Sequence, residues 1–295
     1  MKSRTKIILE GIGLENYESK VLLNNGINLS YIKKGQGKKV LILHGNRDSK
    51  QNFIELIDDL AKDYMVFAVD LRGHGKSDKP KLGYQFEKFV EDIKEFIDAL
   101  KIDKYSMIGH SLGATIAMQL AVDDSESKIE EVILIGTSAK FTPFFRPDMI
   151  KKENIKKTDL GSTNIQELIQ EALRPYFIVE KYSNIKKVVF DNWSNMSPGI
   201  HQALVTQLKH PDLSDVLKDV KQRTLVIAGS EDKVTPVESC KQVSDLIPDA
   251  EFKLVQGCGH FMYLEEEKVI YKLVHDFLAG GEKKNGEKVE CSMSY

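Results

Sequence analysis

The sequence predicts an α/β fold, in which a mostly parallel, eight-stranded sheet is flanked by helices and carries a helical cap insertion. Short apolar runs rich in β-branched residues alternate with longer segments of helical pattern, which is typical of a parallel sheet covered on both faces. An earlier pair of apolar runs is joined by Asn25-Gly26, a dipeptide that favours a tight hairpin turn. The alternation stops once, between about residues 138 and 214, where no strand pattern returns. These observations indicate one α/β core interrupted by one inserted segment.

Each element of this core can be placed on the chain. A hairpin is expected over residues 18–34, and the later strands near 39–44, 65–70, 105–109, 131–136, 224–229 and 251–255. Helices are expected over 51–62 and 85–100, and over LGATIAMQLAV after Ser111, which is apolar on nearly every side, as a helix buried against a sheet would be. The predicted core comprises residues 1–137 and 215–279, the helical cap 138–214, and a polar, disordered tail 280–295.

Charge and hydropathy restrict the function classes. The chain has 295 residues, with 42 Lys and Arg against 44 Asp and Glu, and its net charge of −2 gives no attraction to nucleic acid or to an anionic membrane. No window approaches the ~20 apolar residues of a transmembrane helix, and Glu10 interrupts an N-terminal apolar stretch that is too short for a signal peptide. We therefore expect a cytoplasmic protein that acts on a small molecule, with its oligomeric state left open.

The three cysteines, Cys240, Cys258 and Cys291, have no metal-binding spacing and cannot all pair internally. This usage suggests a reducing compartment. Nothing in the sequence resembles a zinc cluster or a phosphate-binding loop, so we expect no metal and no cofactor. Cys258 lies two residues before His260, which leaves a catalytic thiol open as an alternative.

The most informative segment is YSMIGHSLG at residues 105–113, where Ser111 stands in a Gly-x-Ser-x-Gly pattern at the end of an apolar run. This arrangement predicts a nucleophile elbow, in which a strand turns sharply into a helix with the serine at the tip. Strand and helix come so close there that only small residues fit at positions 109 and 113. The alternative is a serine that merely caps a helix.

Two polar residues follow later strands and suit the needs of a serine nucleophile, which requires a base and an acid that orients it. Asp232 follows the strand-like run at 224–229, and His260 follows the run at 250–255. Both are expected just past the carboxyl ends of parallel strands, where open α/β sheets place their sites. The alternatives are a turn aspartate that caps a helix near Pro236 and a histidine in a surface loop.

Five separated segments resemble the α/β-hydrolase family: LHGN, DLRGHGKSD, GHSLG, GSEDKVTP and GCGHFMYLE, spread over about residues 17–279. The resemblance is to capped, single-domain members, which include carboxylesterases, lactonases, haloperoxidase-like enzymes and carbon–carbon bond hydrolases. In this family the triad follows the chain order Ser, Asp or Glu, His, which implies a triad of Ser111, Asp232 and His260. A serine at 111 argues against the haloalkane dehalogenase branch, which uses an aspartate nucleophile.

The resemblance also implies an oxyanion hole. His44-Gly45-Asn46 matches the loop in which the residue after His-Gly supplies one backbone N–H, and the second donor would be the N–H of Leu112 at a helix N-terminus. His44 is expected to shape the loop by hydrogen bonding and not to act as a base. Many relatives carry a bulky apolar or aromatic residue where this chain has Asn46, so the acyl pocket or the donor geometry is expected to differ.

Substrate clues come from the expected cap and from the residues after His260. An apolar pocket is predicted from six side chains: Phe141, Phe144, Phe145, Trp193, Met196 and Met262. The alternative is that these side chains bury the cap against the core. His201 and His210 have the same two interpretations.

These observations predict a serine hydrolase, carboxylesterase-like, that cleaves small to medium, mainly hydrophobic carboxylic esters through an acyl-enzyme. Two alternatives use the same triad: cleavage of a carbon–carbon bond in a β-diketone-like substrate, and a lyase step that needs only the base. A third is a small-molecule receptor that signals through the cap surface.

Overall fold

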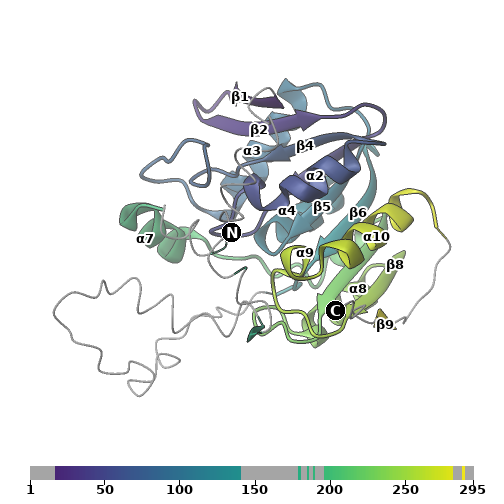
Figure 1. Ribbon diagram of the computed structural model, residues 1–295. Helices are drawn as coiled ribbons and strands as arrows, with labels where there is room; N and C mark the ends of the chain where they lie inside the picture. The colour runs from purple at the N-terminus through teal and green to yellow at the C-terminus, as the bar shows by residue number, and fades with distance from the viewer. Residues whose placement is uncertain are drawn as a thin grey trace, which may run out of the picture.

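The computed structural model describes residues 17–140, 179–180, 185, 189, 196–281 and 288–289. Within these residues one sheet of nine strands runs through the molecule in the order β1-β2-β4-β3-β5-β6-β7-β8-β9 (Figure 1). The strands are β1 (Glu18–Leu22), β2 (Asn28–Lys34), β3 (Lys39–Leu43), β4 (Met65–Val69), β5 (Tyr105–His110), β6 (Ile129–Ile135), β7 (Arg223–Gly229), β8 (Ala250–Val255) and β9 (Lys288–Val289).

The sheet is mostly parallel, which confirms the predicted fold class. Strands β1 and β2 form an antiparallel hairpin at one edge, β2 pairs antiparallel with β4, and all the remaining neighbours are parallel. The eight expected strands all occur close to their expected bounds. The ninth, β9, pairs with β8 and lies inside the tail that was expected to be disordered. The tail at 282–287 and 290–295 lies outside the described residues, as do residues 1–16.

Helices cover both faces of the sheet. The helices are α2 (Ile54–Leu60), α3 (Phe86–Ala99), α4 (Leu112–Asp123), α7 (Pro198–Gln207), α8 (Val237–Leu246), α9 (Met262–Glu265) and α10 (Glu267–Leu278), with short 3₁₀ turns η2 (Lys50–Phe53) and η6 (Leu217–Asp219). The predicted helix at 51–62 is divided between η2 and α2, and the one at 85–100 is α3.

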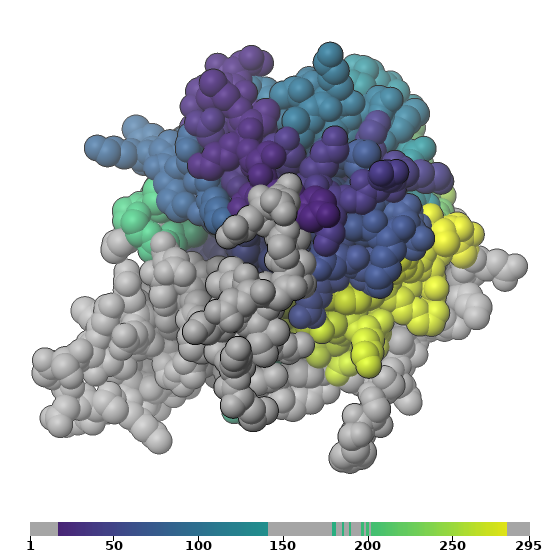
Figure 2. Space-filling view, turned by 45° about the horizontal axis from the view of Figure 1, so that its top comes forward, coloured from purple at the N-terminus to yellow at the C-terminus, as the bar shows by residue number. Residues whose placement is uncertain are grey.

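Alternating side chains of the strands divide the core into two layers. In β3, Leu41 and Leu43 join the buried cluster under α3, α4 and α8, whereas Val40 and Ile42 join the cluster under α2 and α10. This is the two-residue period of a strand buried on both faces. Helices α2 and α10 lie side by side (Figure 2), and His275 on α10 is hydrogen-bonded to Asp59 on α2 at 3.0 Å.

The two ends of the inserted segment lie next to each other. Lys140 and Asp212 form an antiparallel bridge and an ion pair of 2.8 Å, and the N–H of Leu213 donates to the carbonyl of Ala139 at 2.9 Å. The chain therefore leaves the core at Lys140 and returns at Asp212, close to the expected bounds of 138–214. Helix α7 is the main described element between them, and the helical cap stays a prediction.

A buried lysine ties the loop after β3 to the strands beside it. Lys50 is 1% exposed, and its ammonium donates to Asp70 at 2.5 Å, to Ser30 at 2.9 Å and to Glu18 at 2.8 Å. Asp70 also accepts from the N–H of Lys50 at 2.9 Å and of Lys76 at 2.8 Å. Because these residues come from β1, β2, η2 and the end of β4, one ion-pair network fixes four segments relative to one another.

Replacing Lys50 with Met leaves the Asp70 carboxylate buried without its cation. Breaking a buried ion pair on one side costs about 3–5 kcal/mol of unfolding free energy. Urea denaturation of Lys50→Met measures this loss. The matched control is Lys62→Met, which removes an exposed lysine paired with Asp59 and is expected to change stability far less. Equal losses in the two variants would contradict the structural role of Lys50.

Candidate active site

Ser111 lies at a sharp turn between β5 and α4. Its backbone has φ 52° and ψ −114°, a left-handed conformation that is strained for a residue with a side chain. The residue is 9% exposed, and its N–H donates to the carbonyl of Ile135 on the neighbouring strand at 3.1 Å. The geometry is that of the predicted elbow, with the serine between strand and helix.

The two glycines beside Ser111 occupy positions where a side chain does not fit. A Cβ at Gly109 would lie 2.5 Å from the carbonyl oxygen of Gly113, and a Cβ at Gly113 would lie 2.2 Å from the carbonyl oxygen of Leu43. Contacts this short force the backbone to move. Helix α4 therefore approaches both β5 and β3 at backbone distance, which explains the small residues of the motif.

Asp232 and His260 meet although 28 residues separate them. The Nδ1–H of His260 donates to Oδ2 of Asp232 at 2.8 Å, and both residues are buried. Asp232 also accepts from the N–H groups of Val234 and Thr235 and from the hydroxyl of Thr235, at 2.8, 2.9 and 2.6 Å. Because the aspartate holds the proton at Nδ1, the neutral imidazole of His260 carries its lone pair at Nε2, as a general base requires.

Hydrogen bonds between side chains and the backbone hold the segment around His260 beside the elbow. The residue before the serine, His110, donates its Nε2–H to the carbonyl oxygen of His260 at 2.9 Å, and the two rings lie 4.6 Å apart. On the other side, Glu265 accepts from the N–H of Gly259 at 2.5 Å. A Cβ at Gly136 would lie 3.3 Å from both Asp232 Oδ2 and His260 Nδ1. The segments that carry the three predicted triad residues thus meet at the carboxyl edge of the sheet.

We call residues 44–49 the oxyanion loop. His44 accepts from the N–H of Leu71 at 2.9 Å through Nε2, so its Nδ1–H donates to the carbonyl of Gly45 at 2.7 Å. Burial lowers the pKa of His44 to about 3. The ring is therefore neutral and fully used in holding the loop, in agreement with its expected role.

The loop lies directly beside the elbow. A Cβ at Gly45 would lie 3.1 Å from the Cβ of Ser111 and 2.8 Å from Nδ1 of His110. Leu112 is the first residue of α4, so its N–H has no partner within the helix. The two residues predicted to form the oxyanion hole, Asn46 and Leu112, thus belong to segments that flank Ser111 on either side.

The polar side chain of Asn46 is held by a second buried histidine. His74 donates its Nδ1–H to the carbonyl of Arg72 at 2.8 Å, and burial lowers its pKa to about 3. The neutral ring therefore presents an acceptor at Nε2, which lies 3.3 Å from Oδ1 of Asn46. Two acceptors do not share a hydrogen bond, so this contact becomes one when the side-chain amide of Asn46 turns its NH₂ group toward His74.

The predicted pocket residues divide into two groups. Phe141, Phe144, Phe145 and Trp193 lie outside the described residues. Met196 is buried with residues of α7, and Met262 is fully buried in the layer under α2 and α10. These positions favour a packing role for both methionines, and their contact with substrate stays a prediction.

The sequence also left two histidines and three cysteines open as candidate site residues. Burial lowers the pKa of His210 to about 4, and the side chain of His201 lies outside the description. Cys240 and Cys258 are both buried, and burial raises the pKa of Cys240 to about 12, which keeps it a thiol. Cys291 lies outside the described residues. A buried Cys258 beside a complete Asp232–His260 pair gives no support to a catalytic thiol.

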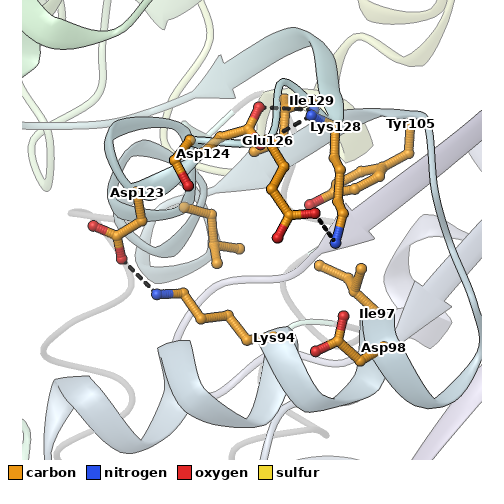
Figure 3. A pocket seen from close by; sticks show the side chains of 11 residues that line it. Lys94, Ile97, Asp98, Tyr105, Asp123, Asp124, Glu126, Lys128 and Ile129 are labelled. Atoms are coloured by element: carbon orange, nitrogen blue, oxygen red, sulfur yellow. Dashed lines mark hydrogen bonds and ion pairs between the residues drawn. The ribbon is translucent and has the colours of Figure 1, made fainter.

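Across the described part of the chain, no group of histidine, cysteine and acidic residues has the arrangement of a metal site. No helix in the same residues is long and apolar enough to cross a membrane. A surface pocket lies at the far end of β5, lined by Tyr105 and by charged residues that include Lys94, Asp124 and Lys128 (Figure 3). Tyr105 begins β5 and Ser111 follows its end, so this pocket is remote from the candidate site.

Two long-range contacts that hold the segments of the site together were not predicted from the sequence. Asp48 and Tyr263 form a buried hydrogen bond of 2.6 Å between the oxyanion loop and α9, although they are 215 positions apart. His110 belongs to a quoted motif, but its contact with the carbonyl of His260 has no local sequence signal.

Comparisons with known proteins agree with this geometry. Residues 38–267 match a family model described as alpha/beta hydrolase fold. The 2-hydroxy-6-oxo-6-(2'-aminophenyl)hexa-2,4-dienoic acid hydrolase of Metapseudomonas resinovorans is 25% identical, over 89% of this chain and 91% of that protein. The structure of Est816, an N-acyl homoserine lactone degrading enzyme, is similar with a TM-score of 0.74 and 25% identity, covering 88% of this chain and all of that one. An esterase from Exiguobacterium antarcticum has the same fold, with a TM-score of 0.76, 23% identity, and coverage of 89% and 99%.

The contact of Gly113 with β3 can be tested by adding one methyl group. Gly113→Ala places a Cβ against the backbone of Leu43, so we expect a loss of at least about 2 kcal/mol in unfolding free energy. The control is Gly199→Ala in α7, where a Cβ meets nothing within 4 Å and the change is expected to be neutral or stabilising by at most about 1 kcal/mol. Chemical denaturation of both variants decides, and an unchanged stability of Gly113→Ala would contradict the close approach.

Proposed function

The chain belongs to the alpha/beta hydrolase fold family, and we propose that it is a serine hydrolase that cleaves small to medium, mainly hydrophobic carboxylic esters. The proposed triad is Ser111, Asp232 and His260. The observation that carries the proposal is the buried Asp232–His260 hydrogen bond of 2.8 Å at the edge where the strained Ser111 stands. Hydrolases among the relatives support the same class of chemistry.

In the proposed acylation step, Nε2 of His260 takes the proton from the Ser111 hydroxyl as its oxygen attacks the ester carbonyl carbon. Asp232 keeps the other imidazole proton at Nδ1 and stabilises the imidazolium that forms. The backbone N–H groups of Asn46 and Leu112 stabilise the oxyanion. Each such donor typically lowers the barrier by about 3–4 kcal/mol. His260 then protonates the leaving alcohol, and the acyl group stays on Ser111.

In the second step, water replaces the alcohol. His260 takes a proton from the water as its oxygen attacks the acyl carbon, and the same two N–H groups stabilise the second tetrahedral intermediate. Collapse of this intermediate returns the proton to Ser111 and releases the acid. No cofactor is needed for either step, because the triad supplies the base, the acid and the nucleophile.

A second candidate is hydrolysis of a carbon–carbon bond by the same residues. Curated relatives at 25–27% identity include 2-hydroxy-6-oxo-2,4-heptadienoate hydrolase of Pseudomonas putida and 2-hydroxy-6-oxo-6-phenylhexa-2,4-dienoate hydrolase of Burkholderia cepacia. In such a reaction the leaving group is a carbanion and not an alcohol, so the site must also hold a second oxygen of the substrate. The side-chain amide of Asn46, which lies beside His74, is one polar group near the elbow that suits this demand.

A chain-length series of p-nitrophenyl esters, from acetate to decanoate, tests the ester proposal. We expect turnover that peaks at a short or medium acyl chain in the wild type and disappears in Ser111→Ala, because that variant has no nucleophile. Turnover retained by Ser111→Ala would contradict the proposal. Turnover of 2-hydroxy-6-oxo-6-phenylhexa-2,4-dienoate in preference to every ester would favour the second candidate instead.

Asp232→Asn tests the proposed role of the aspartate. An amide at this position presents either an NH₂ group or a weaker acceptor to His260, so the imidazole no longer has its lone pair fixed at Nε2. We expect kcat for the best ester to fall by roughly 10³- to 10⁴-fold with little change in KM. Asp245→Asn, an exposed carboxylate on α8 paired with Lys241, is the control and should keep wild-type kinetics. A loss of less than tenfold in Asp232→Asn would exclude the aspartate from the triad.

A further inference from the structure

We propose that Asp48 is a positioning residue whose carboxylate holds the oxyanion loop and the His260 segment in one geometry. The inference rests on the proposed serine hydrolase function, because it assigns a role within that site. Asp48 is 3% exposed, so it does not meet a substrate itself. Its effect on catalysis must pass through the residues that it touches.

Three donors converge on this buried carboxylate. Oδ1 accepts from the N–H of Ser49 at 2.8 Å and from the side-chain amide of Asn52 at 2.6 Å. Oδ2 accepts from the hydroxyl of Tyr263 at 2.6 Å. The first two bonds fix the carboxylate within its own loop and the turn after it. The third bond reaches a different part of the chain, three residues after the proposed base.

Tyr263 is well placed to transmit this constraint. Its ring stacks on Phe53, with centroids 4.1 Å apart and planes at 14°, and it meets the ring of His110 edge-on at 4.9 Å. The residue is 1% exposed. A tyrosine packed against two other rings has little freedom to follow a moving hydroxyl partner, so its bond to Asp48 fixes the distance between the oxyanion loop and the start of α9.

His110 gives the carboxylate a second connection to the site. Because its Nε2–H donates to the carbonyl of His260, the neutral ring has a lone pair at Nδ1, and this atom lies 3.9 Å from Oδ2 of Asp48. Burial and the neighbouring His260 hold the pKa of His110 well below its ordinary value. Neither Nδ1 of His110 nor the ionised Oδ2 of Asp48 carries a proton, so these two atoms do not hydrogen-bond to each other. Oδ2 instead accepts from the hydroxyl of Tyr263.

Protonation of Asp48 rearranges these contacts. A neutral Oδ2–H donates to the lone pair of His110, and Tyr263 then loses its charged acceptor. Burial raises the pKa of Asp48 to about 6, although Tyr263, Ser49 and Asn52 donate to it, and the nearby charge of Asp70 raises it further. The ion pair of Lys50 with Asp70 lies behind the same loop. The carboxylate network is therefore intact above about pH 6 and is lost as the pH falls through that value.

The test is the second-order rate constant for labelling of Ser111 by a fluorophosphonate, which needs the nucleophile, the base and the oxyanion hole but no particular substrate. In Asp48→Asn an NH₂ group or a weaker acceptor meets Tyr263, so this variant resembles the protonated state. We expect labelling on the order of 10- to 100-fold slower in Asp48→Asn and about tenfold slower in Tyr263→Phe. Tyr105→Phe removes a buried hydroxyl at the remote end of β5 and is expected to label at the wild-type rate.

The pH profile separates positioning from a purely structural effect. The ratio of the wild-type labelling rate to the Asp48→Asn rate should be largest above about pH 6, where the Asp48 carboxylate is ionised, and should shrink as the pH falls through that value, because the protonated carboxyl resembles the amide. Any other group whose protonation slows labelling is common to both proteins and cancels in this ratio. Circular dichroism of each variant confirms folding, and Tyr263→Phe supports the test by itself if Asp48→Asn does not fold.

The outcomes distinguish this inference from the proposed function. A wild-type protein that is not labelled at Ser111 contradicts the serine hydrolase proposal. A labelled wild type with Tyr263→Phe reacting at the wild-type rate overturns the role of Asp48 and leaves the serine hydrolase intact. A ratio of wild-type to Asp48→Asn labelling rates that does not change across about pH 6 likewise overturns it.

Discussion

The close approach of α4 to β3 and β5 is the constraint on which the rest of the site depends. With the backbone of Gly113 against the carbonyl of Leu43, the helix has one possible position above the sheet. At this junction Ser111 has a left-handed conformation, and the first turn of the helix lies beside the oxyanion loop. The positions of the proposed nucleophile, the helix N-terminus and the loop thus depend on this backbone contact. The strain at the serine cannot relax without separating the helix from the sheet.

Three histidines near the junction of helix and sheet hold loops in place through hydrogen bonds and do not act as bases. They are His44, His74 and His110. Each donates a ring N–H to a backbone carbonyl, and burial lowers the pKa of each far below its ordinary value. A neutral imidazole offers one donor and one acceptor at a fixed separation, so it can join two loops rigidly without introducing a charge. His260 differs because its Nδ1 partner is a carboxylate, which stabilises the imidazolium form that the proposed mechanism needs.

The fold was predictable, and a candidate triad could be proposed, because their signals are local. Alternating apolar runs gave the eight strands, and the motif around Ser111 gave the turn, since each depends on residues close in sequence. The bond between Asp48 and Tyr263 was not predictable, because it joins positions 215 residues apart and neither belongs to a distinctive pattern. Strand β9 was missed for a related reason: two residues, Lys288 and Val289, carry no periodicity, and their pairing is decided by the exposed edge of β8.

The adjacency of Lys140 and Asp212 has an evolutionary consequence. Where a chain leaves and re-enters a core at neighbouring points, the length and content of the excursion do not affect the register of the strands. The entropy of closing such an excursion also grows only slowly with its length. Selection can therefore exchange the material between these two residues while the carboxyl edge of the sheet keeps its chemistry. Variation between these two residues therefore leaves the strand pairing of the core unchanged.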